Sequence, residues 1–167
     1  MDWLLRKRDQ PSEREGSRPL QPIRLYSAHV VVVAWVDPAN ERITDILSRG
    51  DDLAVLPEGR DPEDVNNWLS INADELLLVV PPPQTSRPEL RVHRQRQAVR
   101  AHIGPYIVTG TAHLKPGHAD DPFLRAAQPF LPLTEAVIEQ PGESPTRVEV
   151  VIANFRHIAD LREYSDG

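Results

Sequence analysis

The order of apolar and polar positions occurs twice along this chain. From Tyr106 to Ile138 the pattern predicts a hairpin strand arm, a short helix and a return strand. The stretch from His29 to Pro57 follows the same order. When Pro38 is aligned with Pro116, the neighbouring apolar positions coincide although the residue types differ. Matching apolar positions are what a repeated core requires, so the sequence predicts an internal duplication.

The expected fold is mainly β (β-rich α+β), with two related small antiparallel sheet or barrel-like units that carry short helices. Each unit is small, so we expect the two to share an interior as a pseudo-twofold pair. Residues 1–22 are predicted to be a disordered tail, 23–83 the first copy and 84–164 the second. The boundary follows the triplet Pro81–Pro83. With 17 prolines in 167 residues, long helices are not expected.

Two strands carry specific expectations. Val30–Val33 is a continuous apolar run, which is typical of a strand covered on both faces. Phe130–Leu133 contains Pro132, which cannot donate to a ladder, so we expect an edge strand there.

Two short helices are predicted in the first copy. Arg42–Gly50 has Thr44 as its expected N-cap and a glycine at its end. Asp61–Leu69 has an aspartate as its expected N-cap and a proline at the first helical position. Trp68 lies on the apolar stripe of the second helix, where we expect it to cover the core.

The second copy resembles a bacterial family of small β-rich domains. The resemblance rests on Gly110, Pro116–Gly117, Phe130–Thr134, and the closing Asn154 and His157–Ile158. It implies a small β-rich fold and no known activity, ligand or catalytic residue. Independently of it, Asn154 and His157 occupy a predicted turn between strands, where asparagine tolerates unusual backbone angles and histidine can bind a carbonyl.

The composition narrows the function classes. The net charge is −6, whereas binding duplex nucleic acid requires a surplus of Lys and Arg, so nucleic acid is not the expected partner. The chain has no cysteine, so it has no disulfide framework or thiolate metal site. No stretch approaches the roughly 20 apolar residues of a membrane span, and the N-terminus lacks a secretory signal pattern. We expect a cytoplasmic protein.

One basic stretch, Arg87–Arg100, is a candidate binding segment. Within it Arg94, Arg96 and Arg100, together with Tyr106, are the predicted binding residues for a ligand held between the two copies. The alternatives are binding to the phosphate backbone of a nucleic acid, binding to an acidic partner, or a solvated strand face that protects a sheet edge by its charge.

His113, His118, Asp120 and Asp121 have the side chains of metal ligands, but three of them lie at a loop and helix start. Acids already cap helices at such positions, so we predict no metal and no cofactor. No nucleophile elbow, phosphate loop or dinucleotide fingerprint is present, and no catalytic residue is predicted.

The N-terminal segment holds a candidate linear motif. Trp3, Leu4 and Leu5 form an apolar anchor, followed by a basic cluster at Arg6–Arg8. The sequence therefore predicts a non-enzymatic interaction or scaffold protein with an unknown protein partner, and allows a homo-oligomer. The alternative is a sensor that binds a small ligand or nucleotide between the two copies.

Overall fold

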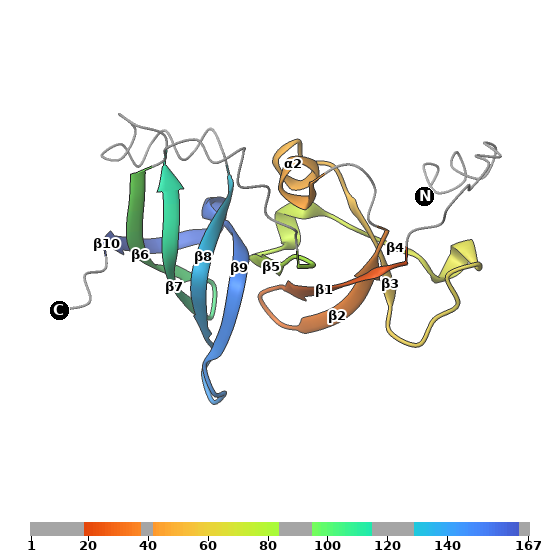
Figure 1. The fold of residues 1–167 in the computed structure, drawn as a ribbon. Coiled ribbons are helices and arrows are strands. Elements are labelled where there is room, and N and C mark those ends of the chain that lie inside the picture. Colours follow the sequence, from red (N-terminus) through yellow and green to blue (C-terminus); the bar gives the residue numbers. More distant parts are fainter. Residues whose placement is uncertain (1–18, 38–41, 84–94, 115–128, 164–167) are drawn as a thin grey trace.

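In this computed structural model, residues 19–37, 42–83, 95–114 and 129–163 are described. Their strands form a curled sheet in the order β10-β6-β7-β8-β9-β5-β1-β2-β3-β4 (Figure 1). The strands are β1 (Gln21–Tyr26), β2 (Val31–Val36), β3 (Leu53–Pro57), β4 (Leu69–Ile71), β5 (Leu78–Val80), β6 (Gln95–Ile103), β7 (Tyr106–Leu114), β8 (Phe130–Glu139), β9 (Thr146–Asn154) and β10 (Ile158–Glu163). Every neighbouring pair is antiparallel. The predicted mainly β fold is confirmed.

The sheet consists of a first half, β1–β5, and a second half, β6–β10. In each half the fifth strand returns to pair with the first, so both have the order fifth, first, second, third, fourth. The halves meet where β5 pairs with β9, which are the fifth strand of one half and the fourth of the other. The predicted pseudo-twofold packing is not confirmed by this order.

At the joint between the halves the sheet is covered on both faces. Leu78 pairs with Ala153, and both side chains enter the core of the second half. Val79 pairs with Ile152, and both enter the core of the first half on the opposite face. All four are at most 1% exposed. Successive strand residues point to opposite faces, so an apolar run is needed wherever both faces are buried.

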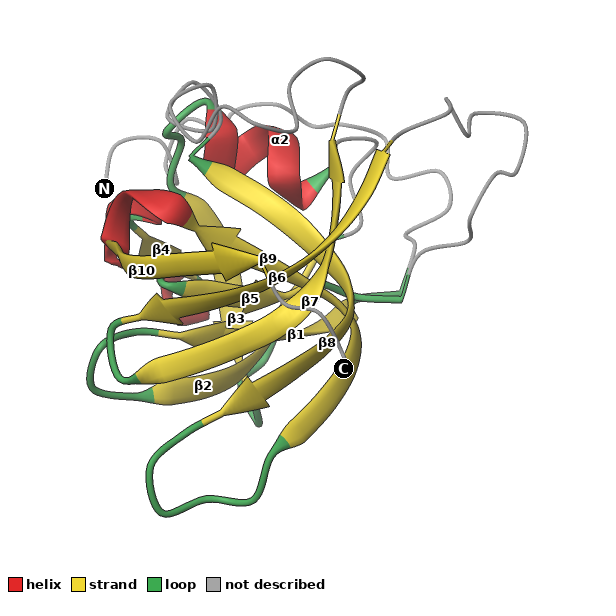
Figure 2. Cartoon of the chain, turned by 90° about the vertical axis from the view of Figure 1, so that its left-hand side faces the viewer, coloured by secondary structure: helices red, strands yellow, loops and turns green. Residues whose placement is uncertain are grey.

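The two cores exchange side chains across the joint. Tyr26 and Leu77 of the first half pack in the core of the second, and Phe130 of the second half packs in the core of the first. The helix α2 (Ile43–Ser48) also contacts β8 (Figure 2). Neither core is therefore built from one half alone.

A short 3₁₀ turn precedes the fifth strand in each half. In the first half it is η2 (Ala73–Glu75), capped by Asn72, and in the second it is η5 (Phe155–His157), capped by Asn154. Asn154 is 0% exposed, and its Nδ2 donates to the carbonyl oxygen of Leu76 at 2.9 Å. It thus ties the two halves together while capping its own turn.

The placement of Val30–Val33 differs from the prediction. Val30 is 55% exposed and Val33 43%, so this stretch is not covered on both faces. Instead β2 alternates in its second part, with Ala34 and Val36 buried in the first core. The run is apolar although one face of the strand meets solvent.

The prediction of an edge strand at Phe130–Leu133 is wrong, because β8 lies between β7 and β9. Pro132 pairs with Ile152 of β9. It immediately precedes Leu133, the first residue of β8 that pairs with β7. An interior strand accommodates a proline here because its pairing with β7 has not yet begun.

The two helix predictions have different outcomes. The first helix exists as α2 and is followed by Gly50 with a φ of +77°, as expected for a glycine stop. However, Arg42 occupies the N-cap position without a side-chain cap, so the predicted role of Thr44 is wrong.

The predicted helix at Asp61–Leu69 is wrong, since only a 3₁₀ turn η1 (Val65–Asn67) forms. The carboxylates of Asp61 and Asp64 each accept from the backbone N–H two residues on, both at 3.0 Å. Such local bonds compete with helix formation. Trp68 is only half-buried, and its Nε1 donates to the carbonyl oxygen of Pro62 at 3.0 Å, so it does not cover the core.

Candidate functional site

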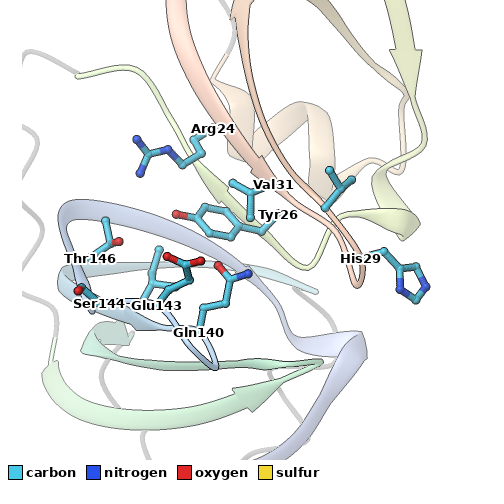
Figure 3. Close-up of a pocket in the computed structure, with 10 residues that line it drawn as sticks. Arg24, Tyr26, His29, Val31, Gln140, Glu143, Ser144 and Thr146 are labelled. Atoms are coloured by element: carbon cyan, nitrogen blue, oxygen red, sulfur yellow. The ribbon is translucent and has the colours of Figure 1, made fainter.

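A cleft of about 430 Å³ lies between the β1–β2 hairpin and the β8–β9 hairpin (Figure 3). Arg24, Tyr26 and Val31 come from the first hairpin. Gln140, Glu143 and Thr146 face them from the second. The walls belong to different halves, so the cleft exists only because the halves are joined at β5 and β9.

Tyr26, which lines the cleft, packs against Tyr106 of the second core. The ring of Tyr26 meets that of Tyr106 edge to face, with centroids 5.3 Å apart and planes at 88°. The hydroxyl of Tyr106 donates to the carbonyl oxygen of Ser27 at 2.6 Å. Burial raises the pKa of Tyr106 above its ordinary value, and the negative charge that Tyr26 can carry raises it further. Tyr106 is therefore a neutral hydrogen-bond donor that fixes the first hairpin.

The cleft carries opposite charges on its two walls. Arg24 lies on one wall and Glu143 on the other (Figure 3). Within the described ranges, neither side chain forms a hydrogen bond or an ion pair. Both are thus available to polar groups of a bound molecule. The described residues contain no group of three His, Cys, Asp or Glu side chains placed to hold a metal ion.

Beside the cleft, the outer face of β1 and β2 is unusually apolar. Val33 lies across from Arg24, and Trp35 across from Pro22. Paired residues share a face of the sheet, so these side chains and Val31 form one surface, which we name the β1–β2 face. Val33 is 43% exposed, and Trp35 is half-buried.

The backbone of β2 is also open along part of its length. Its pairing with β3 covers only Ala34 and Trp35, whereas its pairing with β1 extends from Val31 to Val36. In the described part of the chain, Val31–Val33 has no ladder partner on its second side. An unpaired, uncharged strand edge of this kind can accept another strand.

The structure separates the residues predicted to bind a ligand. Arg96 and Arg100 lie on the outer face of β6, away from the second core. Tyr106 is 1% exposed and packs inside that core. Arg94 lies outside the described residues, as do Trp3, Leu4 and Leu5. The predicted set is therefore not assembled at the cleft, although a cleft between the halves exists.

The described part of the basic stretch, 95–100, lies in β6. Strand β6 lies between β10 and β7, but β10 pairs only with Val99–Ile103, so among the described residues Arg100 is interior to the sheet and Arg96 lies where the second side of β6 is open. Of the possible metal ligands, His113 is hydrogen-bonded through Nε2 to the hydroxyl of Thr134 at 2.8 Å. His118, Asp120 and Asp121 lie outside the described residues.

Sequence patterns did not single out Arg24 or Glu143. Each belongs to an ordinary strand or turn, and their proximity follows from the β5–β9 joint between distant segments. Comparison with family models, with curated proteins and with solved structures finds no match to this chain. Among the described helices, none is long and apolar enough to cross a membrane.

Proposed function

We propose that this is a non-enzymatic interaction or scaffold protein that binds a partner protein through the β1–β2 face. The observation that carries this proposal is the 43% exposure of Val33 on β2, a strand whose second edge is open along Val31–Val33. Exposed apolar side chains that cluster beside polar walls are typical of protein-binding surfaces. The half-buried Trp35 on the same face adds an aromatic side chain of the type that dominates interface energies.

The N-terminal segment is proposed as a second contact. Trp3, Leu4 and Leu5 form an apolar anchor, and the basic residues Arg6–Arg8 follow them. An anchor of this kind recognises a partner as a short linear motif. A cytoplasmic location and a homo-oligomeric form are part of the same proposal.

We further infer that the two halves are related copies of one unit. Support comes from their common strand order and from the capped 3₁₀ turn before each fifth strand. In both turns an asparagine side chain accepts from the N–H two residues on, at 2.9 Å for Asn72 and 3.1 Å for Asn154. Two variants test whether these segments are equivalent: one carries the sequence of 154–158 in place of 72–76, and the other carries the sequence of 72–76 in place of 154–158. The proposal expects both variants to fold.

Partner capture with matched variants tests the interaction proposal. Val33→Glu places a charge on the β1–β2 face, and Leu69→Glu places one at an equally exposed apolar position on β4. We expect wild type and Leu69→Glu to recover the same proteins, and Val33→Glu to lose them. Both variants should melt close to wild type, because exposed substitutions change stability little. An unchanged partner set with Val33→Glu would remove the β1–β2 face from the proposal.

The cleft favours a second candidate, a sensor for a small ligand or nucleotide. Its volume suits a small molecule, and Arg24 lies on its wall without an ion pair among the described residues. A thermal-shift screen against nucleotides tests this candidate, since a ligand of the native state raises the melting temperature. The shift should vanish in Arg24→Gln. A flat response across the screen leaves only the interaction proposal.

A further inference from the structure

The register of β2 decides which of its backbone groups face the open edge. The β1–β2 turn begins where the N–H of Ser27 donates to the carbonyl oxygen of Val30 at 2.9 Å. Bonded and unbonded pairs alternate along an antiparallel ladder, so Val32 also turns its N–H and C=O toward β1. The N–H and C=O groups of Val31 and Val33 therefore point away from β1, toward the second side of β2.

Strand β3 leaves part of this second side empty. It pairs only with Ala34 and Trp35 of β2 and ends at Pro57. The chain then turns, with the N–H of Arg60 donating to the carbonyl oxygen of Pro57 at 3.3 Å. Among the described residues, no strand continues the line of β3 beside Val31–Val33, so the outward backbone groups have no ladder partner.

The residues along this edge favour the addition of a strand. All of them are valines, whose β-branched side chains favour extended backbone. None of them carries a charge, although charge is what ordinarily protects a free strand edge. Their pairing with β1 already holds them in the extended conformation. A further strand can therefore pair here without any rearrangement of β2.

A second copy of the same edge does not fit. Antiparallel self-pairing centred on Val32 would join Val30 of one chain to Ala34 of the other. That side of Ala34 is already taken by Pro57. The occupant is therefore a separate segment that ends or turns beside Pro57. At about 3.3 Å per residue, the edge from Val31 to Val33 spans about 10 Å, so the segment is short.

The register also determines the chemistry of this segment. Paired residues share a face of the sheet, so side chains opposite Val31 and Val33 would join the β1–β2 face beside Trp35. The side chain opposite Val32 would lie on the other face, where Val32 packs against the first core. A charge at either place would be partly removed from water, which is unfavourable. An uncharged, β-branched segment suits both faces.

We propose that the edge Val31–Val33 binds an extended, uncharged and β-branched segment of a partner protein by antiparallel backbone pairing. In this mode main-chain hydrogen bonds provide affinity and alternate side chains provide specificity. The inference rests on the proposed interaction function and deepens it, because it names the backbone atoms and the class of segment that they bind. It fails separately, since the side chains of the β1–β2 face can hold a partner without any backbone bond.

The probe is the capped peptide Thr-Val-Thr-Val-Thr, titrated into the full isotope-labelled chain together with two methylated forms. One form is N-methylated on both valines, and the other on two of the threonines. When the valines lie opposite Val31 and Val33, only the first form loses the donors that face β2. We expect the unmodified peptide and the N-methylthreonine form to bind. The N-methylvaline form should bind about tenfold more weakly, because it cannot donate to β2.

The amide resonances of β2 show where the peptide lies. Those of Val31 and Val33 should shift on titration, whereas that of Val32, which turns toward β1, should shift far less. In the free chain the amide hydrogens of Val31 and Val33 should exchange faster than that of Val32. Slow exchange of both would overturn the proposal, because the edge would already be covered. Shifts that grow with protein concentration without peptide would assign the edge to a second copy and overturn it as well.

Two variants at one position separate backbone pairing from side-chain contact. Val33→Pro removes an N–H that faces away from β1, where a strand tolerates proline, and should lose peptide binding. Val33→Thr keeps that N–H and a branched side chain, and should bind the peptide as wild type does. The methylated peptides keep the test independent of whether the proline variant folds.

Two results would overturn the edge assignment. One is equal binding of the two methylated forms, and the other is no shift at Val31 and Val33 with the unmodified peptide. Loss of captured partners in Val33→Glu would then still support the β1–β2 face. The failure of backbone pairing and the failure of the interaction proposal are therefore distinguishable.

Discussion

The fifth strand occupies the same topological place in both halves but has opposite surroundings. In the first half, β5 is inserted between β9 and β1, and Leu78 and Val79 are 0% exposed. In the second half, β10 pairs with β6 alone among the described strands and lies at the end of their sheet, with exposed Arg162 and Glu163. The two strands have the same place within their halves but different neighbours in the whole sheet. The side chains of each strand match those neighbours: apolar where strands lie on both sides, and charged at the end of the sheet.

The comparison also shows how two open edges of the sheet, one on β10 and one on β2, differ in their capacity to pair. Charged residues on β10 discourage the addition of another strand. The open edge of β2 at Val31–Val33 has no such charge. The protein therefore presents one protected edge in the second half and one edge suited to pairing in the first.

The largest expected effect is at the joint. Leu78→Ala in β5 should lower the free energy of unfolding by about 2–5 kcal/mol, because it empties a fully buried site against Ala153. Leu161→Ala in β10 is the matched control, and since Leu161 is only half-buried its cost should be about 1 kcal/mol. Urea unfolding of both variants measures the difference. Equal losses would mean that β5 and β10 are equally important to the fold.

The next effect compares the two capping asparagines. Asn154→Ala should cost about 2–3 kcal/mol, because it removes the cap of η5 and leaves the buried carbonyl of Leu76 without its donor. Asn72→Ala removes only an exposed cap, for about 1 kcal/mol. Thermal and urea unfolding should rank the two variants in this order. The reverse ranking would refute the role of Asn154 as the tie between the halves.

The smallest effect concerns the hydroxyl of Tyr106. Tyr106→Phe should cost about 1 kcal/mol at neutral pH through loss of the bond to Ser27. The pKa of Tyr106 is raised in the folded state, so its contribution is complete below the unfolded pKa of about 10 and is lost as pH rises from there through the folded pKa.

Urea midpoints measured across that alkaline range check that the pKa of Tyr106 is raised, and not lowered, in the folded state. Wild type should lose stability more steeply than Tyr106→Phe, which has no group titrating at this site. Tyr26→Phe is a useful comparison, because it removes the neighbouring charge that adds to the shift. A steeper loss in Tyr106→Phe than in wild type would contradict the assigned direction.

Several features could be predicted from sequence because they depend on local pattern. The strands of the mainly β fold, the helix before Gly50 and the turn at Asn154 all follow from short-range alternation and capping chemistry. The helix expected at Asp61–Leu69 failed for an equally local reason, the competition of aspartate side chains for backbone N–H groups.

The sequence by itself therefore determined the class of fold, the short elements and the excess of acidic residues. The tertiary structure alone decided that β5 joins β9, that Arg24 faces Glu143, and that Arg100 stands beside Arg162 and in line with Arg147. Those neighbours are distant in the chain, and the periodicity of one strand contains no information about which strand lies next to it.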